Sequence, residues 1–82
     1  MLLWWKGKYM NRYKITVNYD KTFIRKANCC VDAMRRLCLQ YSWSWHMSMI
    51  DADNTRGAKW AKFFIDKEGG INYRENALVE IL

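Results

Sequence analysis

Catalysis or metal binding in this chain of 82 residues would have to use its one histidine or its three cysteines. His46 lies in the segment WSWHMSMI at 43–50, with no nucleophile or orienting group beside it in the sequence. A catalytic base needs both kinds of partner. Cys29, Cys30 and Cys38 lack the C-x₂₋₄-C spacing that is typical of structural zinc sites. We therefore expect a protein that is not an enzyme and that uses no cofactor and no metal.

The acidic segment DADNTRG at 51–57 has some features of a calcium-binding loop, with Asp51 and Asp53 two residues apart. A calcium loop of the EF-hand type also needs glycine at its sixth position and glutamate at its twelfth. Arg56 and Lys62 occupy those positions here. The segment is better interpreted as a connection between strands whose Asp and Asn side chains stabilise local turns.

The formal charge of +6 is concentrated in the first third of the chain. Residues 1–26 contain seven basic side chains and one acidic side chain, whereas residues 27–82 contain seven of each. A basic region of this kind attracts nucleic acid, an acidic protein surface or anionic lipid. A solvated basic edge that only keeps the protein soluble is the alternative.

The cysteines and the apolar segments indicate a cytoplasmic protein. Three cysteines, two of them adjacent, make a poor disulfide framework and favour a reducing compartment. The apolar patch at 2–5 is shorter than the core of a secretion signal. No stretch approaches the roughly 20 apolar residues of a membrane span.

The first regular pattern is RYKITVNY at 12–19, where every second residue is apolar or aromatic. This alternation predicts a strand with Tyr13, Ile15, Val17 and Tyr19 on its core side. A turn at Asp20-Lys21 and a short return strand at Thr22–Arg25 follow. Residues 1–9 are expected to be a short extension, and residues 10–82 a single domain.

The period changes at 28–41, NCCVDAMRRLCLQY, where apolar residues fall on one helical stripe. Asn28 is the expected N-cap, and Asp32 lies near the positive end of the helix dipole. Arg35 and Arg36 are expected on the outer face. The predicted stripe consists of Cys30, Val31, Met34, Leu37, Cys38 and Tyr41.

The remaining patterns complete an α+β fold. A helix that is apolar on one side must cover a sheet, and strands that follow one another through hairpins give an antiparallel sheet. We predict a mainly antiparallel sheet of four or five strands with one helix on one face, in the order β-α-β-β-β. Its later elements are strands at 43–50 and 60–66, a loop at 51–59, a hairpin connection at 67–70, and one or two strands at 71–74 and 77–82, the last of which is alternatively a helical turn.

A single helix leaves one face of the sheet open. The row Trp43, Trp45, Met47 and Met49 is assigned to the core, because the alternating residues Ser44, His46 and Ser48 suit water better.

The strand at 60–66 decides what the open face carries. If Ala61, Phe63 and Ile65 face the helix, then Trp60 and Phe64 lie on the open face beside Lys62. Basic residues and His46 of other strands would share that face. The predicted partner-binding residues are Trp60, Lys62, Phe64, Arg12, Lys14, Asp51, Asp53 and Arg56.

Three functional interpretations remain open. The first is a module that binds a protein or ribonucleoprotein complex through a few aromatic anchors. The second is a nucleic-acid-binding domain, since aromatic and basic side chains on an open sheet are a recurring arrangement for single strands. The third is a homodimeric structural or assembly protein.

In its layout of strand, helix and hairpins over residues 12–82, the chain resembles the small phage-encoded anti-CRISPR proteins. No motif carries this resemblance. It implies a phage inhibitor that binds a host CRISPR-like effector complex, or its guide RNA, and blocks its activity. It transfers no functional residue to this sequence.

Overall fold

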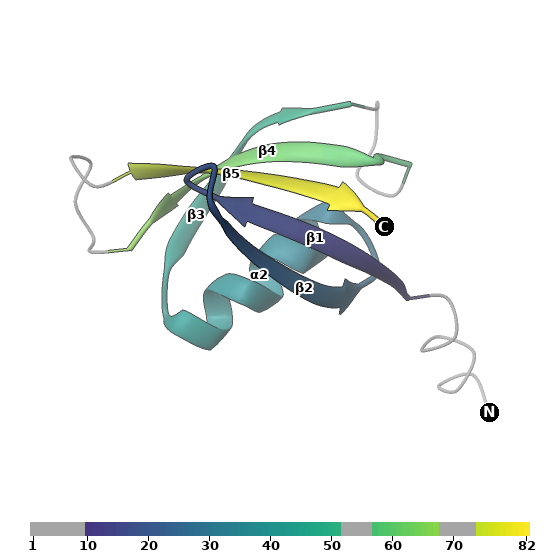
Figure 1. Cartoon of the computed structure of the whole chain (residues 1–82), viewed down its shortest axis with the longest axis horizontal. Coiled ribbons are helices and arrows are strands. Elements are labelled where there is room, and N and C mark those ends of the chain that lie inside the picture. The colour runs from purple at the N-terminus through teal and green to yellow at the C-terminus, as the bar shows by residue number, and fades with distance from the viewer. Residues whose placement is uncertain (1–9, 52–56, 68–73) are drawn as a thin grey trace.

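The structure is a computed structural model that describes residues 10–51, 57–67 and 74–82. Within these ranges five strands form one antiparallel sheet in the order β2-β1-β5-β4-β3, and one helix packs on one face (Figure 1). The predicted α+β class, with a five-stranded sheet, is confirmed. The expected extension at 1–9 lies outside the described residues. The elements are β1 (Asn11–Val17), β2 (Lys21–Ala27), α2 (Cys30–Tyr41), β3 (Ser44–Ile50), β4 (Trp60–Asp66) and β5 (Arg74–Ile81).

The hairpin between β1 and β2 differs from the prediction. Strand β1 ends at Val17, and the turn that follows is at 18–20 rather than at Asp20-Lys21. Asn18 and Tyr19 have φ angles of 53° and 65°, and the Asp20 N–H donates to the Val17 carbonyl at 3.3 Å. Two positive φ angles match the twist of a hairpin. Tyr19 was therefore wrongly assigned to the core, and it is 81% exposed.

Helix α2 begins two residues later than the start of the predicted segment. Its N-cap is Cys29, whose sulfur accepts a hydrogen bond from the Asp32 N–H at 3.4 Å, and not Asn28. The backbone N–H of Asn28 instead donates to the Asp32 carboxylate at 3.0 Å. The helix ends at Tyr41, and its C-cap, Ser42, is in the left-handed region that commonly terminates helices. The buried residues of the helix are Cys30, Ala33, Met34, Leu37 and Cys38, whereas Tyr41 of the predicted stripe is 43% exposed.

A β-bulge in β3 overturns part of the predicted Trp-Trp-Met-Met core row. Met47 pairs with Phe63, but Met49 pairs with Lys62, so that the register shifts between them. An extra residue reverses the alternation of side chains beyond it. Ile50 consequently packs against the core in place of Met49, which is 52% exposed. Met47, at the sheet edge, is 42% exposed.

The core lies between α2 and alternate residues of the three central strands. Full burial of one large apolar side chain contributes about 1.5–3 kcal/mol, so this layer supplies most of the stability. The last strand, β5, runs unbroken from Arg74, which excludes a helical turn at its end. The largest fully buried strand residues are Tyr13, Ile15, Val17, Phe63, Ile65 and Val79.

The described part of the chain contains no helix with the length and apolar character needed to cross a membrane.

Candidate nucleic-acid interface

The face of the sheet opposite α2 carries no described element, and we call it the open face (Figure 1). Strand β4 follows the predicted alternation: Ala61, Phe63 and Ile65 are buried beneath the helix. Lys62 is therefore exposed on the open face, with Trp60 and Phe64 half-buried on either side of it in β4. The sequence predicted this arrangement as one of two possibilities, and the structure confirms it.

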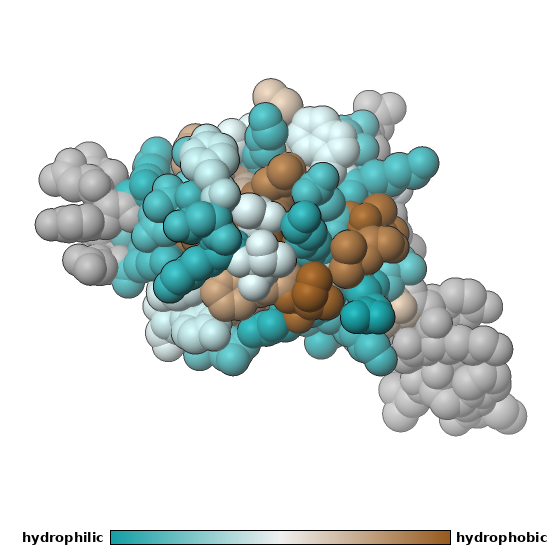
Figure 2. Space-filling view, viewed as in Figure 1, coloured by the Kyte–Doolittle hydropathy of each residue, from teal (hydrophilic) through white to brown (hydrophobic). Residues whose placement is uncertain are grey.

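Register places residues of three other strands near these three side chains. Lys62 lies opposite Leu78 of β5 on one side and Met49 of β3 on the other. Leu78 in turn lies opposite Thr16 of β1. Figure 2 shows this face, where teal hydrophilic surface is mixed with pale and brown surface of higher hydropathy. The face is therefore mixed, with apolar contact surface interspersed with charge.

The aromatic rings of β4 already have cationic neighbours. The Lys62 ammonium lies 5.9 Å from the centre of the Trp60 ring, and the Arg74 guanidinium lies 5.6 Å from that of Phe64. His46 lies on the same face, with its ring centre 5.4 Å from that of Phe64. These distances are within the range of cation–π attraction. Cation–π attraction therefore keeps the Trp60 and Phe64 rings next to positive charge.

Basic residues outnumber acidic ones across the open face. In the strand register, Arg12 of β1 lies opposite Lys26 of β2, and Lys14 of β1 lies opposite Glu80 of β5. Ion pairs join Arg35 and Arg36 to Asp32, and Lys67 to Glu75. The cations of the open face are Arg12, Lys14, Lys26, Lys62 and Arg74. Two carboxylates share this face, because Glu80 lies opposite Lys14 and Asp66 lies opposite Arg74. The face therefore carries an excess of positive charge that can attract an anionic partner.

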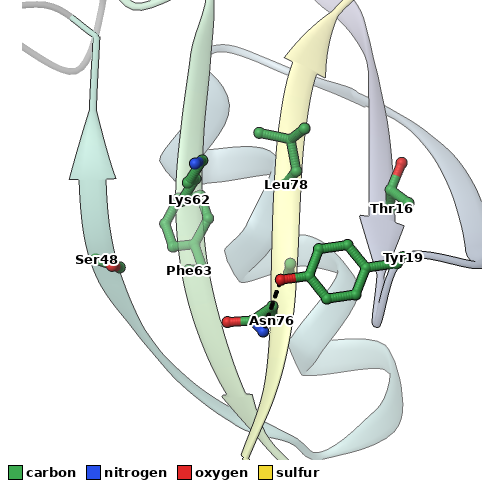
Figure 3. Close-up of a pocket in the computed structure, with 8 residues that line it drawn as sticks. Thr16, Tyr19, Ser48, Lys62, Phe63, Asn76 and Leu78 are labelled. Carbon is green, nitrogen blue, oxygen red and sulfur yellow. Dashed lines mark hydrogen bonds between the residues drawn. The ribbon is translucent and has the colours of Figure 1, made fainter.

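A depression of about 390 Å³ lies on the open face between β1 and β3. Figure 3 shows Lys62, Leu78 and Thr16 along it, with the Tyr19 ring reaching over from the β1–β2 turn. The Tyr19 hydroxyl accepts a hydrogen bond from Nδ2 of Asn76 at 3.1 Å. Ser48 of β3 lines the opposite side of the depression. The depression has space for a small planar group such as a nucleobase.

The predicted loop residues have different outcomes. The carboxylate of Asp51 accepts hydrogen bonds from the backbone N–H groups of Lys59 at 2.9 Å and Trp60 at 3.4 Å. These bonds link the end of β3 to the start of β4 across the connection, and they are not the local turn predicted for the segment. Asp53 and Arg56 lie outside the described residues. The structure thus brings Arg12, Lys14, Trp60, Lys62 and Phe64 together on one face, and Asp51 fixes the loop at the start of β4.

An aromatic cluster at the C-terminal end of α2 was not predicted from the sequence. The rings of Tyr41 and Trp43 are stacked with centres 4.5 Å apart, and the Phe23 ring lies 5.9 Å from that of Tyr41. The Lys67 ammonium lies 4.6 Å from the centre of the Trp43 ring. The sequence does show Tyr41 and Trp43 close together at the end of the predicted helix. It does not show that Phe23, in the predicted return strand, would pack against them.

The thiols of the helix are poorly suited to nucleophilic chemistry. Burial raises the pKa of Cys30 and of Cys38 to about 11, so both thiols are protonated at neutral pH. The Cys30 sulfur lies 3.6 Å from the Ala58 carbonyl oxygen inside the core. No group of three His, Cys, Asp or Glu side chains with a metal-binding arrangement occurs in the ranges 10–51, 57–67 and 74–82.

Comparison of the chain with protein-family models, with curated proteins and with solved structures gives no match.

Proposed function

We propose that the protein acts by binding and that its open face binds single-stranded nucleic acid. The observation that carries this proposal is the alternation of two half-exposed rings, Trp60 and Phe64, with the exposed cation Lys62 on a face without a described covering element. Proteins that bind single strands combine a basic surface along the backbone with aromatic side chains on which bases stack.

The spacing in β4 suits this mode of binding. Trp60 and Phe64 are four residues apart, which corresponds to about 13 Å along a strand. Lys62 lies halfway between them on the same face. Bases stacked near the two rings would leave the connecting phosphates close to the Lys62 ammonium. Lys14 and Arg12 extend the positive surface across β1.

A duplex fits the molecule less well. Recognition of a duplex commonly uses a helix in the major groove. The outer face of α2 carries Arg35 and Arg36, and both guanidinium groups are paired with the Asp32 carboxylate at 2.7 Å and 2.9 Å. Their charge is therefore partly neutralised. The open face is the better candidate for the primary contact.

The inhibitor role implied by the resemblance to anti-CRISPR proteins remains a prediction, as does homodimerisation. Binding of the guide RNA or of a displaced DNA strand in such a complex would use the same open face. The proposal includes a cytoplasmic location, which is supported by the absence of a disulfide among Cys29, Cys30 and Cys38.

The test is the affinity for labelled single- and double-stranded DNA and RNA between about 50 and 200 mM salt. We expect single strands to bind more tightly than duplexes, with affinity falling steeply as salt rises. Trp60→Ala and Phe64→Ala should each cost about 1–3 kcal/mol of binding free energy. Lys62→Gln should weaken binding and lower the salt slope by about one.

Arg35→Gln is the matched control, because it removes the same charge from the opposite side of the molecule. It should leave the affinity nearly unchanged. No binding at the lower salt concentration would refute the proposal, as would equal effects of Lys62→Gln and Arg35→Gln. Binding to a ribonucleoprotein complex without binding to free strands would favour the inhibitor role instead.

A further inference from the structure

A second hollow lies at the edge of the sheet on the helix side, and we call it the edge groove. Its volume is about 340 Å³. It is separate from the depression on the open face, because the two share no lining residue. The edge groove is lined by Lys21, Thr22, Phe23, Tyr41, Trp43 and Lys67.

The connectivity of the fold builds this groove. Helix α2 joins β2 to β3, which are the two edge strands of the sheet. The end of the helix therefore brings Tyr41 against Phe23 of β2 and against Trp43, just before β3. These three rings come from segments that the sheet itself would hold apart. Tyr41 keeps 43% of its surface exposed, although one face of its ring is stacked on Trp43.

Cations border the rings. Lys21 and Lys67 line the edge groove, and the Arg25 guanidinium lies 5.6 Å from the centre of the Phe23 ring. One nearby carboxylate, Glu75, pairs with Lys67 at 3.2 Å. Lys21 and Arg25 remain as cations beside the groove after this pairing, with Asp20 next to Lys21 in the chain. Stacked aromatic rings with adjacent positive charge match a planar base with its phosphate.

The edge groove and the open-face depression are close neighbours. Thr16 lines the depression and Thr22 lines the groove, and these two residues are direct partners across β1 and β2. Directly opposed residues of antiparallel strands have Cα atoms about 4.5–5.5 Å apart. The exposed Tyr19 occupies the turn that joins the same two strands. A flexible strand can therefore pass from one hollow to the other around this turn.

We infer that the edge groove is a second stacking site for the same single strand, which rests on the proposed function of the open face. The strand leaves the open face beside the β1–β2 turn and stacks one base on the Tyr41 ring. Its flanking phosphate lies near Lys21. A methylated cation fits the groove less well, because the Lys67 ammonium already lies 4.6 Å from the centre of the Trp43 ring.

The test compares strands that are long enough for one site with strands that are long enough for both. Oligonucleotides of about 6 and about 16 nucleotides span the range of site sizes for single-strand binders. The wild-type protein should bind the longer strand with a higher affinity than the shorter one. The increase should exceed the statistical factor that comes from the larger number of binding positions on a longer strand. Tyr41→Ala and Lys21→Gln should each remove about tenfold of that gain, without changing the affinity for the short strand.

Leu39→Ala is the matched control, because Leu39 is 66% exposed on the same helix and does not line the groove. Abasic positions at one end of the long strand should also remove the gain, since stacking needs the base and phosphate attraction does not. Tyr41 and Lys21 are both exposed, so these variants should fold, and thermal unfolding checks that they do.

The outcomes separate this inference from the proposed function. If Trp60→Ala weakens the short strand but Tyr41→Ala leaves the length dependence unchanged, the edge groove is not a base site and the open face still binds. If abasic strands or a polyglutamate chain bind as tightly as the intact strand, the groove recognises charge alone and the inference fails. If neither length binds, both proposals fail.

Discussion

The Tyr19 hydroxyl accepts a hydrogen bond of 3.1 Å from Nδ2 of Asn76, a residue 57 positions later in the chain. The Asn18 N–H, one position before Tyr19, donates to the Asn76 carbonyl at 2.7 Å. One residue of β5 therefore holds the β1–β2 turn through both its backbone and its side chain. Tyr19 adopts a positive φ that is uncommon for a bulky residue. These bonds offset the cost of that conformation.

The first prediction concerns the Tyr19–Asn76 bond. Tyr19→Phe removes the hydroxyl and should lower the free energy of unfolding by about 0.5–1 kcal/mol, at the low end for a hydrogen bond because Tyr19 is 81% exposed. Urea unfolding measures this change. Thr22→Ala, in the neighbouring strand, is the control. A loss above about 2 kcal/mol would mean that the hydroxyl and its hydrogen bond are buried, contrary to the structure.

The second prediction uses two adjacent phenylalanines on opposite faces. Phe63 is 1% exposed beneath the helix, so Phe63→Ala should destabilise the protein by about 3–5 kcal/mol through a cavity. Phe64→Ala should cost about 1 kcal/mol, because its ring is half-exposed on the open face. Thermal unfolding compares the two variants. Similar losses would contradict the assignment of the faces of β4.

The third prediction concerns acid stability. Burial raises the pKa of Asp32, but hydrogen bonds from Asn28, Arg35 and Arg36 outweigh it and lower the pKa to about 2. The folded-state pKa lies below the unfolded value, so the stabilisation is complete above pH about 4 and is lost as pH falls toward 2. Asp32→Asn should therefore cost about 1–2 kcal/mol at neutral pH, because the exposed arginines are screened by solvent.

Urea unfolding of the Asp32→Asn variant and the wild type across pH 2 to 7 checks this prediction. The difference between the two proteins should shrink below pH about 4. Asp20→Asn in the exposed turn provides a control with the same chemical change. A difference that is independent of pH would assign the effect to packing and not to ionisation.

The fourth prediction concerns thiol reactivity. Cys30 and Cys38 are buried, and their pKa is raised to about 11, whereas Cys29 at the helix N-cap is half-buried. Iodoacetamide at mildly alkaline pH should modify Cys29 first and should reach the other two only after unfolding. Mass spectrometry of labelled peptides with and without denaturant identifies the sites. Rapid native labelling of Cys38 would show that α2 opens readily.

Local patterns of burial in the sequence predicted the fold class and the faces of most regular segments. Alternation with period two in β1 and helical periodicity in α2 reflect burial on one side, and burial is the strongest local signal that a sequence carries. For the same reason it determined that Phe63 and Phe64 lie on opposite faces, although it left open which of them faces the helix. The helix decided that choice, because only tertiary packing defines the inner side.

The exceptions to these patterns depend on contacts between distant segments. The bulge in β3 moves Met49 beside Lys62, because pairing with β4 fixes the register and alternation within β3 does not. The turn takes Tyr19 out of the core, because the twist of the hairpin requires positive φ at that position. The edge groove exists because α2 joins the two edge strands and brings Tyr41 to Phe23. Contacts between distant segments depend on the path of the whole chain, and no local pattern encodes them.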